Sequence, residues 1–374
     1  MARWLPEFPI RERCLFLDHA AVSPLPRPVA DAMRRRVTEQ ESAGALVREQ
    51  WLQSELAVRT LAADLLACRP ADVSIVRSTS EGLSLIAQGL SWRPSDRVLV
   101  GTEEPAANVA PYLALARWGV VVHRFPTPSG RVLAETVEPL LRPPTKLVAL
   151  SWVAFHTGWV AEVELIARLA RERGVIVVLD ALQGLGVLPS TLAELGVDAL
   201  VSDGHTWLLG PEGAGIMVTT EALRARLQPV LAGWHNVDRA ATEFFLDRLE
   251  FHRDGRRFEP GSPPTGLIAG LEAALNLLLE VGIEEVHRRV SSHTRSLTND
   301  LLQAGWNVAS PGSSHPIAGI VAARHPVLPA DEVARRLRQR SVEVSARQGL
   351  VRFSPHFYTT AGELEALRVI LRKL

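Results

Sequence analysis

Residues 200–216 read Leu-Val-Ser-Asp-Gly-His-Thr-Trp-Leu-Leu-Gly-Pro-Glu-Gly-Ala-Gly-Ile, and the interpretation of the rest of the chain starts from them. The segment begins as a short apolar strand, turns at residues 203–205 and continues into a glycine-rich run. Polar residues between two apolar runs, on a turn at the end of a strand, are typical of a binding or catalytic site. We therefore expect a functional site at this turn.

The segments before this turn alternate between strand and helix patterns. Runs of strand length occur at residues 73–76, 97–101, 147–152 and 175–179, and a further run at 120–125 is interrupted by His123 and Arg124. Helical patterns lie around and between them, at about 27–41, 46–67, 79–90, 132–141 and 163–173. Largely apolar strands that alternate with amphipathic helices predict a parallel sheet covered on both faces.

Polar residues follow several of these predicted strands at the point where each strand ends. In such sheets the site lies beyond the carboxyl ends of the strands, so these residues are candidates. They are Ser80, His156, Thr157, Asp180, Gln183, Asp203 and His205. Asp180 follows the run Val-Ile-Val-Val-Leu, where an unpaired carboxylate is costly, so it is either a paired functional group or a helix N-cap.

The turn before the helix at 79–90 allows two interpretations. Small hydroxyl residues at Ser78, Thr79 and Ser80 suit an anion, because free backbone N–H groups and the helix dipole point to this position. A serine or threonine followed by Glu81 is equally an ordinary N-terminal cap. The residues alone leave both open.

The composition limits the classes of partner. Acidic and basic residues balance at 41 each, so neither nucleic acid nor an anionic membrane surface is expected as a partner. The cysteines, Cys14 and Cys68, form neither a disulfide framework nor a metal-ligand spacing, and no histidine pair has ligand spacing on one helix. We expect no metal site and, from the lack of a secretory or membrane-spanning pattern, a cytoplasmic location.

From about residue 15 to the end, several motifs in order resemble the class V aminotransferases, which are fold type I enzymes dependent on pyridoxal phosphate. The family motif Ser-x-x-His-Lys-Trp-Leu-x-Gly-Pro-x-Gly is similar to residues 202–213, and the motif Arg-Phe-Glu-x-Gly-Thr-x-Asn to residues 257–264. The resemblance implies an α/β fold with a mostly parallel seven-stranded sheet, in which the run at 215–219 is the antiparallel strand.

The same resemblance implies a smaller α+β domain at the carboxyl end. The expected boundaries are an arm at 1–26, a large domain at 27–262 and a small domain at 263–374. Helices are expected at about 266–281, 284–304 and 330–339 and from 361, with strands at 317–322 and 342–344.

The resemblance also assigns roles at the cofactor. Asp180 of the Asp-x-x-Gln motif pairs with the protonated pyridine nitrogen, and Gln183 contacts the ring oxygen. Asp203 and His205 are further cofactor-binding candidates. Thr79 and Ser80 are similar to the family's phosphate cup, and Ser262 lies on a loop that in homodimers reaches the phosphate of the neighbouring subunit. A homodimer is therefore implied.

Three further residues are implied on the substrate side. His19 lies in the segment that lines this side in the family, and His156 follows a predicted strand. Arg352, in the segment Arg-Phe-Ser-Pro-His-Phe-Tyr, corresponds to the arginine that grips a substrate carboxylate, for which a planar guanidinium fork is suited. The implied substrate is a small carboxylic acid.

The chain departs from the family pattern at the cofactor itself. Thr206 stands at the position of the lysine that holds pyridoxal phosphate as a Schiff base, and a hydroxyl can neither form the imine nor shuttle the substrate proton. Pro105 stands where a ring-stacking residue is usual, and Pro264 replaces an asparagine. The chain has two lysines, of which Lys146 is expected before a strand, away from the site, and Lys373 is the penultimate residue.

Four interpretations follow from these departures. The pocket catalyses another reaction without the cofactor, with Asp180, His205 and Thr206 at the catalytic positions and Arg352 as carboxylate anchor. Alternatively, it holds pyridoxal or pyridoxamine phosphate non-covalently, with no covalent cofactor. In the third interpretation, Thr206 is an engineered change that traps an intermediate. In the fourth, the chain is a non-catalytic binding protein.

Within the family, the sequence of residues 155–158 and 202–213 most resembles the isopenicillin N epimerase-like branch. Cysteine desulfurases carry a catalytic cysteine on a loop shortly before the carboxyl-terminal arginine. Residues 341–350 contain no cysteine, so desulfuration is not expected.

Overall fold

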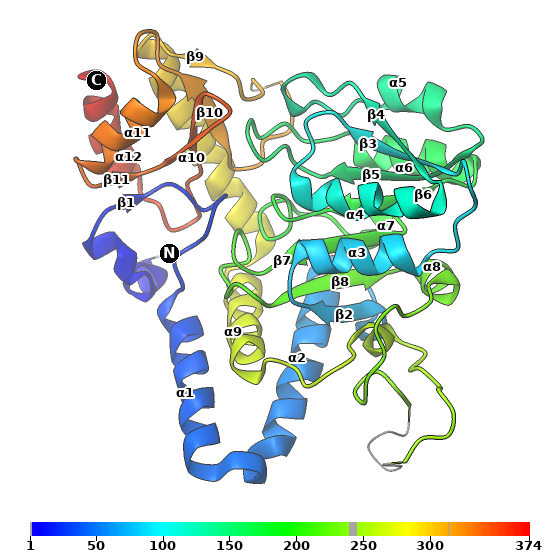
Figure 1. Ribbon diagram of the computed structural model, residues 1–374. Helices are drawn as coiled ribbons and strands as arrows, with labels where there is room; N and C mark the ends of the chain where they lie inside the picture. The colour runs from blue at the N-terminus through cyan, green and yellow to red at the C-terminus, as the bar shows by residue number, and fades with distance from the viewer. Residues whose placement is uncertain (1, 239–244, 313) are drawn as a thin grey trace.

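Seven strands form the central sheet of the computed structural model, which describes residues 2–238, 245–312 and 314–374 (Figure 1). Their order is β2-β8-β7-β6-β5-β3-β4, and β8 runs antiparallel to both of its neighbours while the other pairs are parallel. They are β2 (Val73–Val76), β3 (Arg97–Gly101), β4 (Val121–Phe125), β5 (Thr145–Ser151), β6 (Ile176–Asp180), β7 (Ala199–Asp203) and β8 (Gly215–Thr219). The predicted α/β fold is confirmed.

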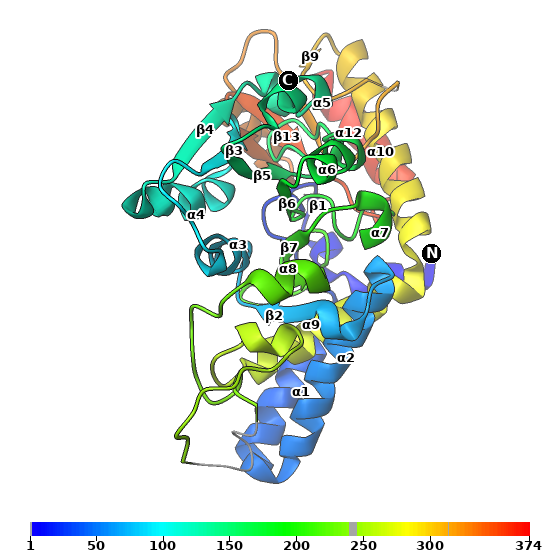
Figure 2. The same cartoon turned by 90° about the vertical axis from the view of Figure 1, so that its right-hand side faces the viewer.

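Alternate residues of each strand pack against different helical layers. Val98 and Val100 of β3 lie in one apolar cluster with α3 (Thr79–Gly89) and α4 (Ala110–Leu113), whereas Leu99 lies in another with α6 (Val163–Glu172). Figure 2 shows α3 and α4 on one side of the sheet and α6 on the other. Because both faces are covered, the central positions of the inner strands are largely apolar and most polar residues lie near the strand ends.

The position of β4 at the edge of the sheet explains why polar residues interrupt its apolar sequence. It pairs with β3 alone, and Val121 and Arg124 are exposed while Phe125 is buried. A strand with one open edge and a partly open face can carry polar residues at little cost, so His123 and Arg124 do not break it.

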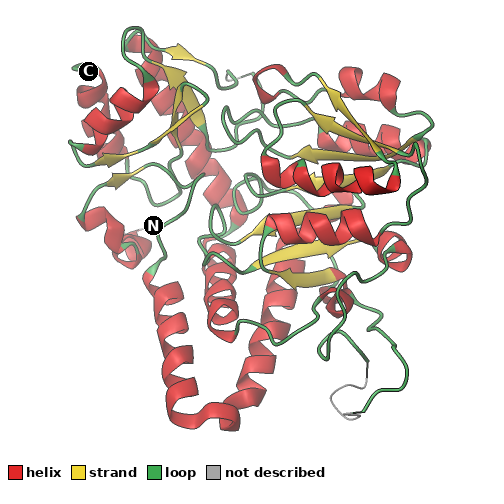
Figure 3. Cartoon of the chain, in the orientation of Figure 1, coloured by secondary structure: helices red, strands yellow, loops and turns green. Residues whose placement is uncertain are grey.

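Three long helices extend below the sheet (Figures 1 and 3). The helices α1 (Arg27–Ala43) and α2 (Arg48–Leu66) form a hairpin, and α9 (Thr265–Val281) packs against both. The short helices of the large sheet are α5 (Ala134–Val137), α7 (Leu192–Leu195) and α8 (Glu221–Arg226).

The carboxyl-terminal part carries a second, antiparallel sheet of order β12-β13-β10-β9. One of its faces packs in an apolar cluster on three helices. The strands are β9 (Asn307–Val308), β10 (Val321–Arg324), β12 (Ser345–Arg347) and β13 (Leu350–Phe353), and the helices are α10 (Ile283–Gln303), α11 (Ala330–Arg338) and α12 (Ala361–Leu371). Antiparallel strands with helices on one face have the expected α+β arrangement, and the expected domain boundaries stay a prediction.

Some predicted strand bounds are wrong. The strand predicted at 317–322 begins at Val321, because Gly319 has a φ of +73° and the chain turns there. The strand predicted at 342–344 divides into β11 (Val342–Glu343) and β12, and β11 pairs in parallel with β1 (Leu15–Phe16) of the amino-terminal arm. Lys146 lies inside β5, as its second residue, and not before the strand.

Among the described residues, no single helix is both long enough and apolar enough to cross a membrane. The pair α9 and α10 reaches that length and hydropathy only when taken together, and the two helices meet at an angle of 79°.

Candidate functional site

The carboxyl ends of the inner strands bring the candidate residues together. Asp180 is the last residue of β6, Asp203 is the last residue of β7, and Thr206 lies in the turn that follows. Ser151, at the end of β5, is in register with Asp180. This edge of the sheet is where the strand pattern places a site.

Asp180 is a buried carboxyl group with few partners. It is 4% exposed, and Oδ1 accepts one hydrogen bond of 3.0 Å from the backbone N–H of Leu182. Burial raises the pKa of Asp180 to about 7; the hydrogen bond from Leu182 opposes this shift, and the neighbouring carboxylate of Glu104 adds to it. A cationic hydrogen-bond donor bound here would stabilise the ionised form of Asp180.

Glu104, which the sequence analysis did not single out, is fully engaged. Its carboxylate accepts hydrogen bonds from the backbone N–H and the hydroxyl of Ser151, at 2.8 and 2.5 Å, and from Asn108 Nδ2 at 2.9 Å. Burial raises its pKa, and these hydrogen bonds oppose the shift. Glu104 therefore ties the loop after β3 to the end of β5.

Several buried polar atoms around these strand ends have no hydrogen-bond partner within the described structure. They are Thr79 Oγ1, Asn108 Oδ1, Tyr112 Oη, His156 Nδ1 and Arg352 Nε. Tyr112 is close enough to Asp180 and Glu104 for both carboxylates to raise its pKa, in addition to the larger effect of burial. Buried polar atoms are nearly always paired, so a bound ligand or water accounts for such a set.

The start of α3 lies over the end of β7. A Cβ atom at Gly82 would lie 2.5 Å from Val201 Cγ1, so the helix approaches the strand as closely as a glycine allows. The Ser78 hydroxyl accepts the N–H of Glu81 at 3.2 Å, which confirms the N-cap interpretation. Thr79 is buried and Ser80 is exposed, both in the first turn of the helix, where unpaired backbone N–H groups favour an anion.

His205 lies in the turn after β7 and is paired with a carboxylate. Its Nδ1 lies 3.1 Å from Oδ1 of Asp203, which also accepts the backbone N–H of Gly204 at 2.7 Å. Burial alone lowers the pKa of His205, but the Asp203 carboxylate outweighs burial and raises it above its usual value. In its protonated form His205 would favour an anionic ligand group.

Thr206 is 1% exposed and bonded within the protein. Its hydroxyl donates to the carbonyl oxygen of Leu182 at 2.9 Å, and its own carbonyl oxygen accepts from the Ser23 hydroxyl at 2.6 Å. Lys146 lies near the amino end of β5, where Nζ contacts Ser91 O and lies 3.1 Å from Asp96 Oδ2. It lies at the opposite end of the sheet from the site.

Gln183 and His19 face protein partners. The Gln183 side chain donates to Ala20 O and accepts from Trp207 Nε1, both at 2.9 Å. His19 is fully buried, with Nδ1 2.7 Å from Ser354 O and Nε2 2.7 Å from Tyr358 Oη. Both ring nitrogens of His19 are therefore used inside the core, and the structure does not place this residue on the wall of a cavity.

Arg352 is likewise occupied. It is 2% exposed, Nη2 donates to Asp18 Oδ1 at 3.1 Å and Nη1 donates to Phe155 O at 2.8 Å. Burial lowers its pKa and the Asp18 carboxylate opposes that shift. The aspartate partner, which the sequence analysis did not identify, is supplied by the amino-terminal arm.

Ser262 is exposed and lies on the loop before α9. It lines a small cavity of about 40 Å³ together with Arg77 and Glu81 near the start of α3.

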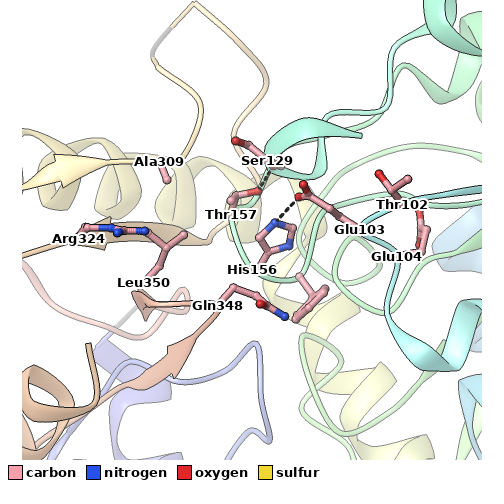
Figure 4. Close-up of a pocket in the computed structure, with 11 residues that line it drawn as sticks. Thr102, Glu103, Glu104, Ser129, His156, Thr157, Ala309, Arg324, Gln348 and Leu350 are labelled. Carbon is pink, nitrogen blue, oxygen red and sulfur yellow. Dashed lines mark hydrogen bonds and ion pairs between the residues drawn. The ribbon is translucent and has the colours of Figure 1, made fainter. Parts of the chain in front are cut away.

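A larger cavity of about 580 Å³ lies between the central sheet and the small sheet (Figure 4). In it His156 Nε2 lies 3.0 Å from Glu103 Oε2. Thr102 and Glu104 lie toward one end and Arg324 and Leu350 toward the other, as Figure 4 shows. The remaining lining residues are Ser129, Phe155, Thr157, Ala309 and Gln348. The sequence analysis identified His156 but neither Glu103 nor the residues of the small sheet.

One cluster has the composition of a metal site. Glu55, His235 and Glu259 have ligand atoms within 4.8 Å of one another. Both carboxylate oxygens of Glu259, however, accept from the Arg59 guanidinium at 2.6 Å, and His235 lies 3.3 Å from Glu55. We interpret this cluster as a buried charge network, in which the arginine takes the place that a cation would need.

Comparisons with known proteins agree with this fold. The model of the family described as aminotransferase class-V matches residues 15–367. A relative from Aeropyrum pernix, described as "Probable cysteine desulfurase", is 31% identical over 361 residues, which cover 92% of this chain and 86% of the relative. YcbU of Bacillus subtilis, described as an uncharacterized aminotransferase, is 26% identical over 359 residues, covering 96% and 93%.

Among solved structures, the apo cysteine desulfurase of Thermococcus onnurineus has a TM-score of 0.90 at 23% identity and covers 100% of this chain and 97% of its own. The fold is therefore that of pyridoxal-phosphate-dependent enzymes of this kind. The chain belongs to the class V aminotransferase family. Its expected likeness to the epimerase-like branch stays a prediction.

The residues present fit pyridoxal phosphate at two places and not at others. Asp180 suits a protonated ring nitrogen, and the first turn of α3 with His205 suits the phosphate. The hydroxyl of Thr206 offers no amine, Pro105 offers no aromatic ring, and the amide of Gln183 is already bonded on both sides. The site therefore offers groups suited to the ring nitrogen and the phosphate but no amine at residue 206.

The buried His19 predicts a dependence of stability on pH. Burial lowers its pKa from 6.5 to about 4, so between these values the unfolded chain binds a proton that the folded chain does not. The free energy of unfolding should fall as the pH is lowered from 6.5 toward 4, by about 3 kcal/mol from this group. Urea unfolding of the wild type and of His19→Gln, whose amide can keep both hydrogen bonds, should show a shallower pH dependence for the variant.

The variant His123→Gln, on the edge strand β4, is the matched control and should keep the wild-type dependence. Equal pH dependence in His19→Gln and the wild type would contradict the assignment of His19 to the core.

Proposed function

We propose that this chain is an enzyme that binds a small, amino-acid-like carboxylic acid beside the ends of the central strands and acts on it without a Schiff base to a lysine of its own. The observation that carries the proposal is the cavity of about 580 Å³, which is lined by the His156–Glu103 pair and by Glu104. Glu104 is also close enough to the buried Asp180 to raise its pKa, after the larger effect of burial, so the cavity lies near the end of β6. The bonding of Thr206 to Leu182 and the position of Lys146 support the second half of the proposal.

His156 is the proton acceptor in this proposal. A carboxylate accepts hydrogen bonds, so the Glu103 contact favours the tautomer with the proton on Nε2 and leaves a free lone pair on Nδ1. Burial lowers the pKa of His156, although Glu103 opposes the shift, so the ring is neutral at neutral pH. A neutral imidazole oriented by a carboxylate is the arrangement of a general base.

Asp180 is the second acid–base group of the site. With a pKa of about 7 it can give or take a proton near neutral pH. His205, paired with Asp203, is better suited to hold an anionic group than to move a proton. Thr206, the remaining candidate for the catalytic positions, serves here to hold the turn against Leu182.

Among the described residues, no cationic side chain pairs with the buried carboxyl of Asp180. This favours a second candidate function, in which the chain holds pyridoxal or pyridoxamine phosphate non-covalently. Asp180 would hold the ring nitrogen, and the first turn of α3 with His205 would hold the phosphate. When bound, this cofactor supplies an electron sink for reactions at the substrate α-carbon.

Cysteine desulfuration is not part of the proposal, although several relatives bear that name. Neither Cys14 nor Cys68 lines the cavity, and burial raises the pKa of both thiols, that of Cys68 to about 11. A thiol with a raised pKa is a poor nucleophile at neutral pH. The chain therefore lacks a thiolate where the reaction would need one.

We also propose that the chain forms a homodimer through the hairpin of α1 and α2. Val37, Leu46, Leu52 and Leu56 are exposed there, with Leu46 90% exposed. A run of exposed apolar side chains on a projecting hairpin is suited to burial against a second copy.

The role of His156 predicts the effect of its replacement. With amino acids and small carboxylic acids as a panel in D₂O, ¹H NMR should show exchange or conversion of a substrate by the wild type. His156→Gln, which can still donate to Glu103, should lower the rate by about 100-fold or more. Glu103→Gln should lower it less, and the control His287→Gln, on α10, should not change it. Full activity in His156→Gln would rule out this residue as the base.

The cofactor question has a separate spectroscopic test. If the second candidate is correct, pyridoxal phosphate should bind saturably to the wild type without a Schiff-base absorbance band and without a borohydride-stable adduct. Asp180→Asn should then weaken binding by about tenfold. Thr206→Lys should gain the band and the adduct if the pocket is otherwise intact. A lack of saturable binding would eliminate the second candidate and leave the first.

The homodimer predicts a change of mass in solution. In sedimentation equilibrium the wild type should have twice the mass of the chain, and Leu46→Glu with Leu56→Glu should shift it toward the monomer. Leu302→Glu is the matched control, because Leu302 is exposed to a similar extent on α10, away from the hairpin. A monomeric wild type would disprove the dimer.

A further inference from the structure

The small sheet presents two chemically different faces. Val321, Ala323, Val351 and Phe353 lie in the apolar cluster with α10, α11 and α12. Successive residues of a strand alternate between the faces, so Ala322, Arg324 and Arg352 lie on the opposite one. Leu350, which shares that face with Arg352, and Arg324 both line the large cavity. The second face is therefore turned toward the central sheet.

The strand register gathers positive charge on this face. Arg352 lies opposite Ala322 on β10 and opposite Ser345 on β12, while Arg347 lies opposite Leu350. Arg324 lies two residues after Ala322 on β10 and is therefore on the same face. Arg347 is close enough to Arg352 to lower its pKa, after the larger effect of burial.

These three arginines have one carboxylate between them. Asp18 pairs with Arg352 at 3.1 Å and also accepts from the Ser345 hydroxyl at 2.8 Å. Within residues 2–238, 245–312 and 314–374, neither Arg324 nor Arg347 is in an ion pair, and both are exposed. Of the two, Arg324 lines the cavity.

The hairpin between β12 and β13 places a second hydrogen-bond donor, the Gln348 amide, on the wall of the same cavity (Figure 4). Its two turn residues, Gln348 and Gly349, both have positive φ, at +51° and +74°. Positive φ at both residues is what a two-residue hairpin turn of type I′ requires. Gln348 lines the cavity, and Arg324 Nη2 lies 3.8 Å from the position of a Cβ on Gly349.

We propose that Arg324 and the side-chain amide of Gln348 form an anion subsite at the small-sheet end of the cavity, which binds an oxyanion, carboxylate or phosphate, at the end of the substrate remote from the reacting group. This assignment rests on the proposed function, because it describes the substrate of the same cavity. The guanidinium and the amide both donate hydrogen bonds, and a guanidinium suits the planar or tetrahedral oxygens of such a group.

The charges at the other end of the cavity give the ligand a direction. Glu103 and Glu104 line that end, where they bond to His156 and Ser151. An acidic group is repelled there and attracted to Arg324. Arg352, whose Nη groups are both engaged, is left to hold the arm through Asp18.

Binding measurements on the full chain test the subsite without knowledge of the reaction. Isothermal titration with succinate and, separately, with inorganic phosphate, at constant ionic strength, should show saturable binding of at least one of them. Succinate alone indicates a carboxylate subsite, and phosphate alone or more tightly indicates a phosphate subsite. Arg324→Gln should weaken the binding by about tenfold or more, because a charged hydrogen-bond donor is lost. Gln348→Ala should weaken it less.

Arg168→Gln is the matched control, since Arg168 is an exposed arginine on α6, and it should bind as the wild type does. Circular dichroism would establish that each variant is folded. Absence of saturable binding to the wild type, equal affinity in Arg324→Gln, or an equal loss in Arg168→Gln would overturn the subsite. Because the titration measures binding and the His156 variants measure turnover, failure of the subsite is distinguishable from failure of the proposed function.

Discussion

The burial of both faces of the central sheet is the constraint on which the rest of the structure depends. Helices cover each face, so the inner strands carry largely apolar side chains between their ends. Polar chemistry is thereby confined to the carboxyl ends, where Asp180 and Asp203 close β6 and β7. A carboxyl group in that position loses its hydration, which is why Asp180 titrates near neutrality and why its surroundings call for a ligand.

Compared with the family motif, the site keeps some of the expected residues and has lost the reactive one. The end of β6, the first turn of α3 and the Asp203–His205 pair keep the residue types that the family resemblance assigns to the ring nitrogen and the phosphate. Thr206 removes the amine, and its hydroxyl is used to brace the turn. The proposed function therefore assigns the proton transfer to His156, which pairs with Glu103 on the wall of the cavity between the two sheets.

The local sequence pattern was sufficient to predict which strands end in polar residues and where most helices lie. Apolar periodicity and turn residues are properties of neighbouring positions, so they can be read without the fold. It was insufficient for His19 and Arg352, whose roles depend on partners 335 and 334 residues away. Arg324 and Gln348 carry no local signal, since a cavity between two sheets exists only after both have folded. The two-residue strands β1 and β9 were missed because they are defined by pairing and not by their own sequence.

The amino-terminal arm has a consequence for the order in which the protein assembles during its synthesis. Ala20 and Ser23 are bonded to Gln183 and Thr206, while β1 and Asp18 are bonded to β11 and Arg352. A ribosome adds roughly 5–20 residues per second, amino terminus first. The first twenty residues therefore leave the ribosome long before their partners near residue 350, and the pocket is completed only when the last strands emerge.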